Sequence, residues 1–161
     1  MSSRRLLGAC LACMLVVLAA CAAKPSKPVE TKAVLAATAD VNPDSSGRPS
    51  PVVVRIYQLR GDAEFNGADF FALYDKEKDT LGASLILRDE QTLFPGQQIE
   101  MKLPLSADAR FVGAIAGFRD VQGTRWRAVV GAPEKSLLKV LSKNRITVRV
   151  DKAAITLSTK D

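Results

Sequence analysis

The sequence predicts a mainly β protein, a two-sheet antiparallel β-sandwich with a short helical insertion, in a chain of 161 residues. In most of the chain after residue 33, apolar residues recur at every second position, which is the period of a strand with one buried face. These runs are short and turn residues separate them, a pattern typical of a sandwich. Helical spacing is confined to a few stretches, and the clearest of them lies at about residues 66–81.

Residues 1–20 resemble a bacterial lipoprotein signal peptide. Arg4 and Arg5 give a basic start, residues 6–20 are apolar without a charge, and the segment ends in Leu18-Ala19-Ala20-Cys21. The apolar run is too short for a comfortable membrane span. The pattern predicts cleavage after residue 20 and a lipid on Cys21. The alternatives are an uncleaved anchor helix and a secreted protein with an unmodified cysteine.

The cysteines support lipidation. Cys10 and Cys13 lie within the predicted signal peptide, so Cys21 is the remaining cysteine of the mature chain and no disulfide is expected. A free thiol is a liability in an oxidising compartment, and a lipid removes it. In lipoprotein sorting signals, which this segment resembles, an aspartate directly after the cysteine retains the protein at the inner membrane. Here that position is Ala22, which favours the outer membrane.

A short tether is predicted between the lipid and the folded domain. Residues 21–32 contain Pro25, Pro28, three lysines and few apolar residues, which is typical of an extended linker. The sandwich domain is predicted to comprise residues 33–161.

The expected strands follow from alternation along the chain. Residues 111–118 are apolar on both faces, as in a central strand, and residues 126–130 are its expected hairpin partner across a turn at Gln122-Gly123. The remaining strand-like runs are 33–41, 52–59, 99–104, 146–151 and 155–158.

Two segments depart from the period of two. Residues 69–81 place Phe70, Leu73 and Tyr74 on one helical face, and Asp69 is a suitable N-cap. Residues 134–142 have leucines at helical spacing after Pro133, but a strand fits this segment as well.

Composition excludes several classes of function. The chain has no histidine, so a zinc hydrolase or a Ser-His-Asp enzyme is excluded. The net charge is +6 and falls when the two arginines of the signal peptide are removed, so no nucleic-acid partner is expected. No cofactor, no metal site and no catalytic residue are predicted.

The acidic residues are the remaining candidates for chemistry. Asp75, Glu77 and Asp79 alternate with lysines, and Thr80 stands where a calcium loop needs glycine, so these acids are predicted to form a solvated helix face. Asp89-Glu90 is predicted to be a polar strand end or turn. A glycosidase pair among the acids stays open, because the fold sets the separation of two carboxylates.

One loop exceeds what a connection between strands requires. Residues 43–51 contain three prolines, one glycine and one cation between two strand signals, whereas a two-residue hairpin needs none of these. Such a loop would project, and its prolines would limit the entropy lost on binding a partner. The alternative is a plain connector. The predicted partner-binding residues are Pro43, Asp44, Ser45, Ser46, Gly47, Arg48, Pro49, Ser50 and Pro51.

Several segments in the same order resemble the outer-membrane lipoprotein family of type VI secretion systems, known as TssJ. After Leu18-Ala-Ala-Cys21, the segments are Asp40-Val-Asn-Pro-Asp44, Gly47-Arg-Pro-Ser-Pro-Val-Val-Val-Arg-Ile-Tyr-Gln-Leu59, Phe65, Ala68-Asp69-Phe70, Leu81-Gly82, Pro95-Gly96, Val112-Gly113, Ala116-Gly-Phe-Arg-Asp120 and Trp126-Arg127. The resemblance covers nearly the whole mature chain.

The resemblance implies a transthyretin-like sandwich with a helical insertion, a loop protruding between the first two strands, and no enzyme activity. It implies a protein at the periplasmic face of the outer membrane that binds the periplasmic C-terminal domain of the inner-membrane TssM-type subunit. The partner-binding loop of the family maps onto residues 43–51, where Asp44, Ser45, Ser46 and Arg48 are the candidates for contact.

Two other classes of function remain as alternatives. A lipoprotein that binds a peptidoglycan fragment or another small ligand would need a deep pocket lined by aromatic residues. A periplasmic hydrolase that uses carboxylates would need a buried pair of acids with shifted pKa values.

Overall fold

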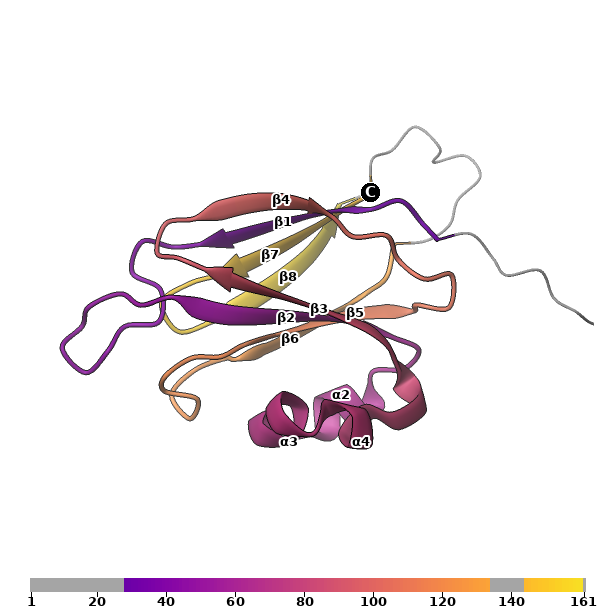
Figure 1. Ribbon diagram of the computed structural model, residues 1–161, viewed down its shortest axis with the longest axis horizontal. Coiled ribbons are helices and arrows are strands. Elements are labelled where there is room, and N and C mark those ends of the chain that lie inside the picture. Colours follow the sequence, from indigo (N-terminus) through magenta and orange to yellow (C-terminus); the bar gives the residue numbers. More distant parts are fainter. Residues whose placement is uncertain (1–27, 134–143, 161) are drawn as a thin grey trace, which may run out of the picture.

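Alternating apolar residues build two facing sheets in the computed structural model, which describes residues 28–133 and 144–160 (Figure 1). The first sheet has the strand order β4-β1-β7-β8 and the second has the order β3-β2-β5-β6. This arrangement confirms the predicted mainly β sandwich. The strands of the first sheet are β1 (Lys32–Ala37), β4 (Gln98–Lys102), β7 (Arg145–Val150) and β8 (Ile155–Lys160), and those of the second are β2 (Val52–Leu59), β3 (Leu85–Leu93), β5 (Phe111–Ala116) and β6 (Arg127–Gly131).

One strand pair is parallel. β1 runs beside β7 in the same direction, with Lys32 opposite Arg145 and Ala37 opposite Val150. Every other pair of neighbouring strands in the described part of the chain is antiparallel. The predicted antiparallel sandwich thus has one parallel pair, which the sequence did not reveal because a period of two fixes the buried face of a strand and not its direction.

Strand β3 was not predicted from the alternation of apolar residues. It pairs with β2 along its whole length, from Val52 opposite Leu93 to Leu59 opposite Leu85. Its middle is polar, so alternation does not indicate a strand there. Asp89 and Glu90, predicted at a strand end or turn, lie within β3 instead.

Strand β5 separates two hydrophobic clusters. Between the sheets, one of its faces packs with residues such as Leu35, Val54 and Val148. Its other face joins a second cluster beneath the helices, which includes Tyr57 and Phe65. The prediction of a central strand buried on both faces is confirmed. Both clusters lie within residues 28–160, so this part of the chain carries its own core.

The second cluster requires a glycine in β5. A β-carbon built on Gly113 would lie 2.7 Å from Cζ of Phe65, well inside normal contact distance. The ring of Phe65 also packs against Tyr57, with the ring centroids 5.5 Å apart. Gly113 thus lets the helical insertion lie close against the sheet.

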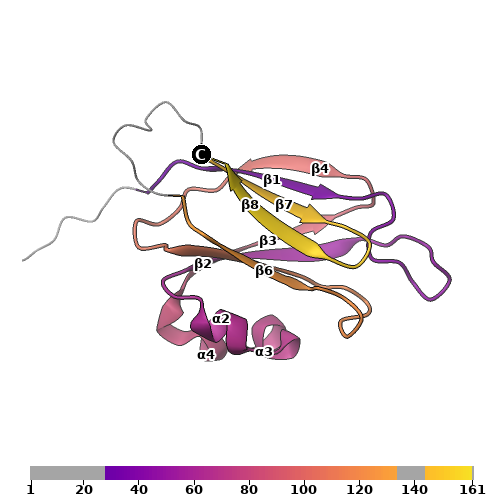
Figure 2. The same ribbon diagram turned by 180° about the vertical axis from the view of Figure 1, so that it is seen from behind.

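The helical insertion is divided into short helices that cover the outer face of the second sheet (Figures 1 and 2). They are α2 (Ala63–Gly67), α3 (Phe70–Asp75) and α4 (Glu77–Leu81), followed by the 3₁₀ turn η2 (Gly82–Ser84). Asp69 caps α3 as predicted, since its Oδ1 accepts a hydrogen bond from the N–H of Ala72 at 2.9 Å. The single helix expected over 69–81 breaks at Lys76, whose backbone leaves the helical region.

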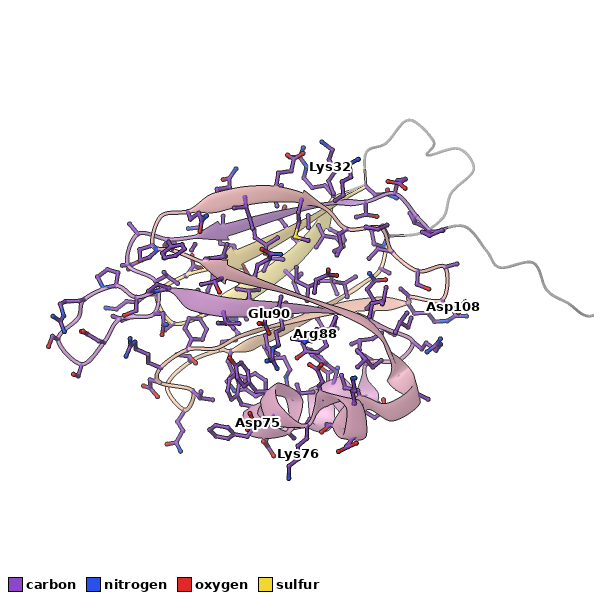
Figure 3. The ribbon with its side chains drawn as sticks, viewed as in Figure 1. Lys32, Asp75, Lys76, Arg88, Glu90 and Asp108 are labelled. Atoms are coloured by element: carbon purple, nitrogen blue, oxygen red, sulfur yellow. The ribbon has the colours of Figure 1, made fainter. Side chains whose placement is uncertain are left out.

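A network of charged side chains binds the insertion to the sheet (Figure 3). Nε of Arg55 on β2 lies 2.7 Å from Oε2 of Glu90, and its guanidinium lies 4.0 Å from the ring centroid of Tyr74. Nε of Arg88 on β3 lies 2.9 Å from Oε1 of Glu77 on α4. Arg88 also reaches Glu90, with Nη1 2.7 Å from Oε2.

The acidic face of the insertion therefore differs from the prediction at one residue. Asp75 and Asp79 are exposed, as expected of a solvated helix face. The side chain of Glu77 is only 14% exposed and lies between two arginines. The prediction was wrong here because helical spacing does not reveal which side chains a neighbouring sheet contacts.

The first described residues pair with the sandwich slightly earlier than the predicted domain boundary at residue 33. Residues 29–31 already pair with residues 103–105, through hydrogen bonds such as Val29 N–H to the carbonyl of Leu105 at 2.8 Å. The structure thus begins its pairing within the stretch expected to be a tether. Residues 1–20, Cys21 and the segment 134–142 lie outside the described residues.

We expect Glu77→Gln to lower the free energy of unfolding by about 1–3 kcal/mol, because it removes the carboxylate between Arg88 and Arg55 in a half-buried site and leaves both arginines to share Glu90. The matched double variant Asp75→Asn/Asp79→Asn should change it by less than about 0.5 kcal/mol, since both carboxylates are exposed. Urea unfolding of the mature domain measures both values. Equal effects of the two variants would contradict a structural role for Glu77.

Candidate binding surface at the loop end

Three connections meet at one end of the sandwich, opposite the end where residue 28 lies (Figures 1 and 2). They are the β1–β2 loop (38–51), the β5–β6 loop (117–126) and the β7–β8 turn (151–154). The β1–β2 loop extends furthest beyond the sheets, at the left of Figure 1. The prediction that residues 43–51 project is therefore confirmed. We refer to these three connections together as the loop end.

Asn42 joins all three connections. Its side chain is buried, its Nδ2 donates to the carbonyl of Pro51 at 2.7 Å, and its Oδ1 accepts from the N–H of Arg119 at 2.8 Å. Its own N–H donates to the carbonyl of Lys152 at 3.3 Å. The backbone of Asn42 has φ +47°, a left-handed conformation that asparagine tolerates better than most residues. The loop base is thus fixed to the rest of the sandwich.

The tip of the β1–β2 loop, residues 44–48, closes on itself. Oδ1 of Asp44 accepts hydrogen bonds from the N–H groups of Ser46 at 2.9 Å and Arg48 at 3.0 Å. The N–H of Asp44 donates to the carbonyl of Arg48 at 2.9 Å. Gly47 supplies the turn, with φ +75°. The tip therefore has a defined conformation without any partner.

The charges of the tip are coupled. Nε of Arg48 lies 2.8 Å from Oδ2 of Asp44. The backbone N–H of Arg48 and then its guanidinium hold the pKa of the Asp44 carboxyl below its ordinary value of 3.8. Even so, the side chain of Arg48 remains 79% exposed. Its guanidinium can contact a partner while Asp44 holds it in place.

The predicted loop residues divide by exposure. Pro43 and Asp44 are half-buried, while Ser50 is buried and its N–H donates to the carbonyl of Val41 at 3.1 Å. Ser50 therefore closes the loop base, and its side chain is not placed to contact a partner. The exposed residues are Ser45, Ser46, Gly47, Arg48, Pro49 and Pro51.

A groove of about 570 Å³ lies between the loop and its neighbours. Asp44 lines one side, and Arg119, Thr124 and Lys152 line the others. Arg125 holds the neighbouring connections together, because its N–H donates to the carbonyl of Ala153 at 3.0 Å. The side chains that line the groove thus carry both signs of charge. A larger hollow, of about 840 Å³, lies at the opposite end of the sandwich beside Val29.

The sequence pointed to the tip of this surface but not to the residues that hold it. Asn42, Arg119 and Lys152 are far apart in the chain, and only the fold brings them together. The one available signal was Asn42 itself, an asparagine at the end of a strand-like run and directly before a proline. Such a residue is a good candidate for a left-handed turn.

The remaining candidates for chemistry are held in other roles. Glu90 accepts hydrogen bonds from Arg55 and Arg88, and the bond from Arg55 is the main cause that lowers the pKa of Glu90 below its ordinary 4.5. A carboxylate kept ionised in this way is a poor general acid. The aromatic residue that lines the groove, Phe118, is buried, so no aromatic face is offered to a ligand there.

Within residues 28–133 and 144–160, no group of three acidic, histidine or cysteine side chains converges to hold a metal ion. In the same ranges, no helix is long and apolar enough to cross a membrane.

The family described as "Type VI secretion lipoprotein, VasD, EvfM, TssJ, VC_A0113" matches residues 30–153. The chain belongs to this family. The match covers most of the chain, from β1 to β7 with the helical insertion, and ends just before β8. The resemblance found in the sequence is therefore confirmed, and the protein is a type VI secretion lipoprotein.

Solved structures are similar to this lipoprotein over nearly their whole length. The T6SS lipoprotein TssJ1 from Pseudomonas aeruginosa is 29% identical with a TM-score of 0.75, and the alignment covers 83% of this chain and 98% of that one. Serratia marcescens Lip, a membrane-bound component of the type VI secretion system, is 32% identical with a TM-score of 0.73, covering 83% and 99%.

A further similar chain occurs in a structure described as "T6SS protein TssM C-terminal domain (869-1107) from EAEC". It is 27% identical with a TM-score of 0.64, and the alignment covers 81% of this lipoprotein and 98% of that chain. No curated protein sequence matches the chain.

We expect Asn42→Ala to lower the free energy of unfolding by about 2–4 kcal/mol, because it removes two buried hydrogen bonds and places alanine at a positive φ. The matched variant Asn42→Gly tolerates the same backbone conformation and should lose about 1–3 kcal/mol, from the hydrogen bonds alone. Urea unfolding separates the two contributions. Wild-type stability of Asn42→Ala would contradict the role of Asn42 as the residue that joins the connections.

Proposed function

We propose that this lipoprotein anchors the trans-envelope complex of a type VI secretion system to the outer membrane. In this proposal, a lipid on Cys21 holds the protein at the periplasmic face of that membrane. The loop end binds the periplasmic C-terminal domain of the inner-membrane TssM-type subunit. The protein acts by binding and not by catalysis.

The observation that carries the proposal is the closed tip of the β1–β2 loop on its fixed base. Residues 44–48 are ordered by their own hydrogen bonds, and Asn42 fixes the loop base to the two neighbouring connections. A surface that is already ordered loses little conformational entropy when a partner binds. The tip exposes a guanidinium and two hydroxyls, and the exposed Pro49 and Pro51 follow it, a mixture suited to a polar protein surface.

A comparison supports the identity of the partner. The alignment with the similar chain in the TssM C-terminal domain structure covers 81% of this 161-residue chain and 98% of that chain. The similar chain is therefore much shorter than a TssM domain of residues 869–1107. We infer that this chain is a lipoprotein of the present family, solved together with the TssM domain. A protein of this fold and that domain would then form one complex.

The geometry of the domain suits an anchor. Residue 28, the first described residue, lies at one end of the sandwich, and the loop end lies at the other (Figure 1). A protein held by a lipid at its N-terminus would therefore direct the loop end away from the membrane, toward a partner that extends from the inner membrane.

We predict that replacing residues 44–48 with a Gly-Gly linker abolishes or strongly weakens binding to the TssM-type periplasmic domain. Interface energy concentrates in a few residues, and the linker removes the tip while it leaves Asn42 and the loop base unchanged. A binding titration measures affinity, and circular dichroism tests folding. Wild-type affinity of the folded, shortened protein would place the contact on another surface.

Two point variants refine this test. Arg48→Ala should weaken binding less than the shortened loop does, and the difference from wild type should shrink at high salt if Arg48 steers an acidic partner. The variant Lys76→Gln/Lys78→Gln removes two exposed cations from the helical insertion and should bind as wild type.

Lipidation is tested separately. Metabolic labelling with a fatty acid is expected to mark the wild-type protein and not Cys21→Ser, because the predicted signal leaves no other cysteine in the mature chain. Cell fractionation should then find the wild type with the outer membrane and the variant in the soluble periplasmic fraction. Equal labelling of both proteins would contradict a lipid on Cys21.

A further inference from the structure

A row of cations crosses the outer face of the first sheet at the end opposite the loop end. Lys32 on β1 is in register with Lys102 on β4 and with Arg145 on β7. All three residues are exposed. Arg145 is in turn in register with Lys160 on β8. Neighbouring strands lie about 4.8 Å apart, so Lys102, Lys32 and Arg145 fall within about 10 Å of one another.

The outer face of the first sheet is bare and basic, unlike that of the second sheet. The helical insertion covers the second sheet, while no described segment covers the first (Figures 1 and 2). The outward residues of β1, β4 and β7 comprise four cations and one acid, Glu100. The cations are Lys32, Lys102, Arg145 and Arg149, of which Arg149 lies near the loop end and pairs with Asp151.

The row carries an electrostatic cost within the fold. Like charges directly opposite one another on neighbouring strands destabilise a sheet. Glu100 forms an ion pair with Lys32 and offsets part of the repulsion, but the row retains more cations than acids. A surface of negative charge placed against the row would relieve this repulsion.

The row lies where the chain arrives from Cys21. Lys32 is the first residue of β1, and Figure 3 shows it on the outer side of the first sheet near the point where the N-terminal segment joins. Arg60 and Arg110 lie at the same end, beside the larger hollow near Val29, where Nη2 of Arg60 is 3.7 Å from Oδ2 of Asp108. Few residues separate this end from Cys21, so a lipid there would keep the basic surface near the membrane.

We propose that this end of the domain, through Lys32, Lys102 and Arg145, docks directly onto the anionic headgroups of the bilayer. The inference rests on the lipid anchor of the proposed function, because the anchor brings the row to the membrane. The contact orients the sandwich, so the loop end points away from the bilayer instead of swinging freely on the N-terminal segment. Each cation near an anionic surface strengthens binding about fivefold, and several cations together give a useful orienting force.

The test uses the mature domain without its lipid, Cys21→Ser from residue 21 onward, so that lipidation plays no part. The probes are vesicles of phosphatidylcholine alone and vesicles in which about a third of the lipid is phosphatidylglycerol. We expect co-sedimentation with the anionic vesicles only, and loss of binding at high salt. Equal binding to both kinds of vesicle, or none to the anionic ones, would overturn the proposal.

Charge variants locate the contact. Lys102→Gln/Arg145→Gln should weaken binding to anionic vesicles about thirtyfold, whereas Lys76→Gln/Lys78→Gln, with the same loss of charge on the helical insertion, should not weaken it. Glu100→Gln should strengthen binding severalfold. The Lys102→Gln/Arg145→Gln domain should keep its melting temperature or gain a little, since the variant removes repulsion within the sheet.

Partner binding is measured on the same variants. Lys102→Gln/Arg145→Gln should bind the TssM-type domain as wild type does, because the row and the loop end lie at opposite ends. If that variant loses the partner and keeps the vesicles, the row serves a protein contact and the membrane proposal is wrong. If it loses neither, the membrane proposal is also wrong, while the proposed function stands.

Discussion

The loop end depends on the burial of one asparagine. Asn42 is 4% exposed, and both ends of its amide are satisfied, by Pro51 on one side and Arg119 on the other. A buried amide that lost either partner would cost about 1–3 kcal/mol, so the three connections are held in one arrangement. The projecting tip stands on that arrangement. The tip is ordered internally by Asp44. Without a fixed base, however, the ordered tip would have no constant direction.

The two sheets have different outer faces, and this difference organises the molecule. The second sheet is covered by the helical insertion, which Arg55, Arg88 and Glu77 hold in place and for which Gly113 leaves room. No segment among the described residues covers the first sheet, which carries the basic row. The two ends differ as well, since one receives the N-terminal segment and the other carries the loops. The proposed membrane contact and the proposed partner contact therefore lie on separate surfaces.

Charged residues that look alike in the chain have distinct roles in the fold. Asp75 and Glu77 are two residues apart on a polar stretch, yet the first faces solvent and the second lies between arginines from β2 and β3. Likewise Arg48 presents its guanidinium to solvent, whereas Arg127 donates to the carbonyls of Phe65 and Ala68 at 2.7 and 2.8 Å, and burial lowers its pKa. Exposure and partner, not residue type, decide which charge is available for binding.

The sequence alone determined the features that local physics governs. A period of two in hydrophobicity indicated most strands and their buried faces. Asp69 indicated the start of α3, and the prolines and glycine of residues 43–51 indicated a projecting loop. The tertiary structure alone decided the rest. The parallel pairing of β1 with β7, the polar strand β3, the burial of Glu77 and the meeting of Asn42 with Arg119 and Lys152 all depend on contacts between residues far apart in the chain. Hydrophobic periodicity reports which face of a segment is buried, and it contains no information about the neighbour that buries it.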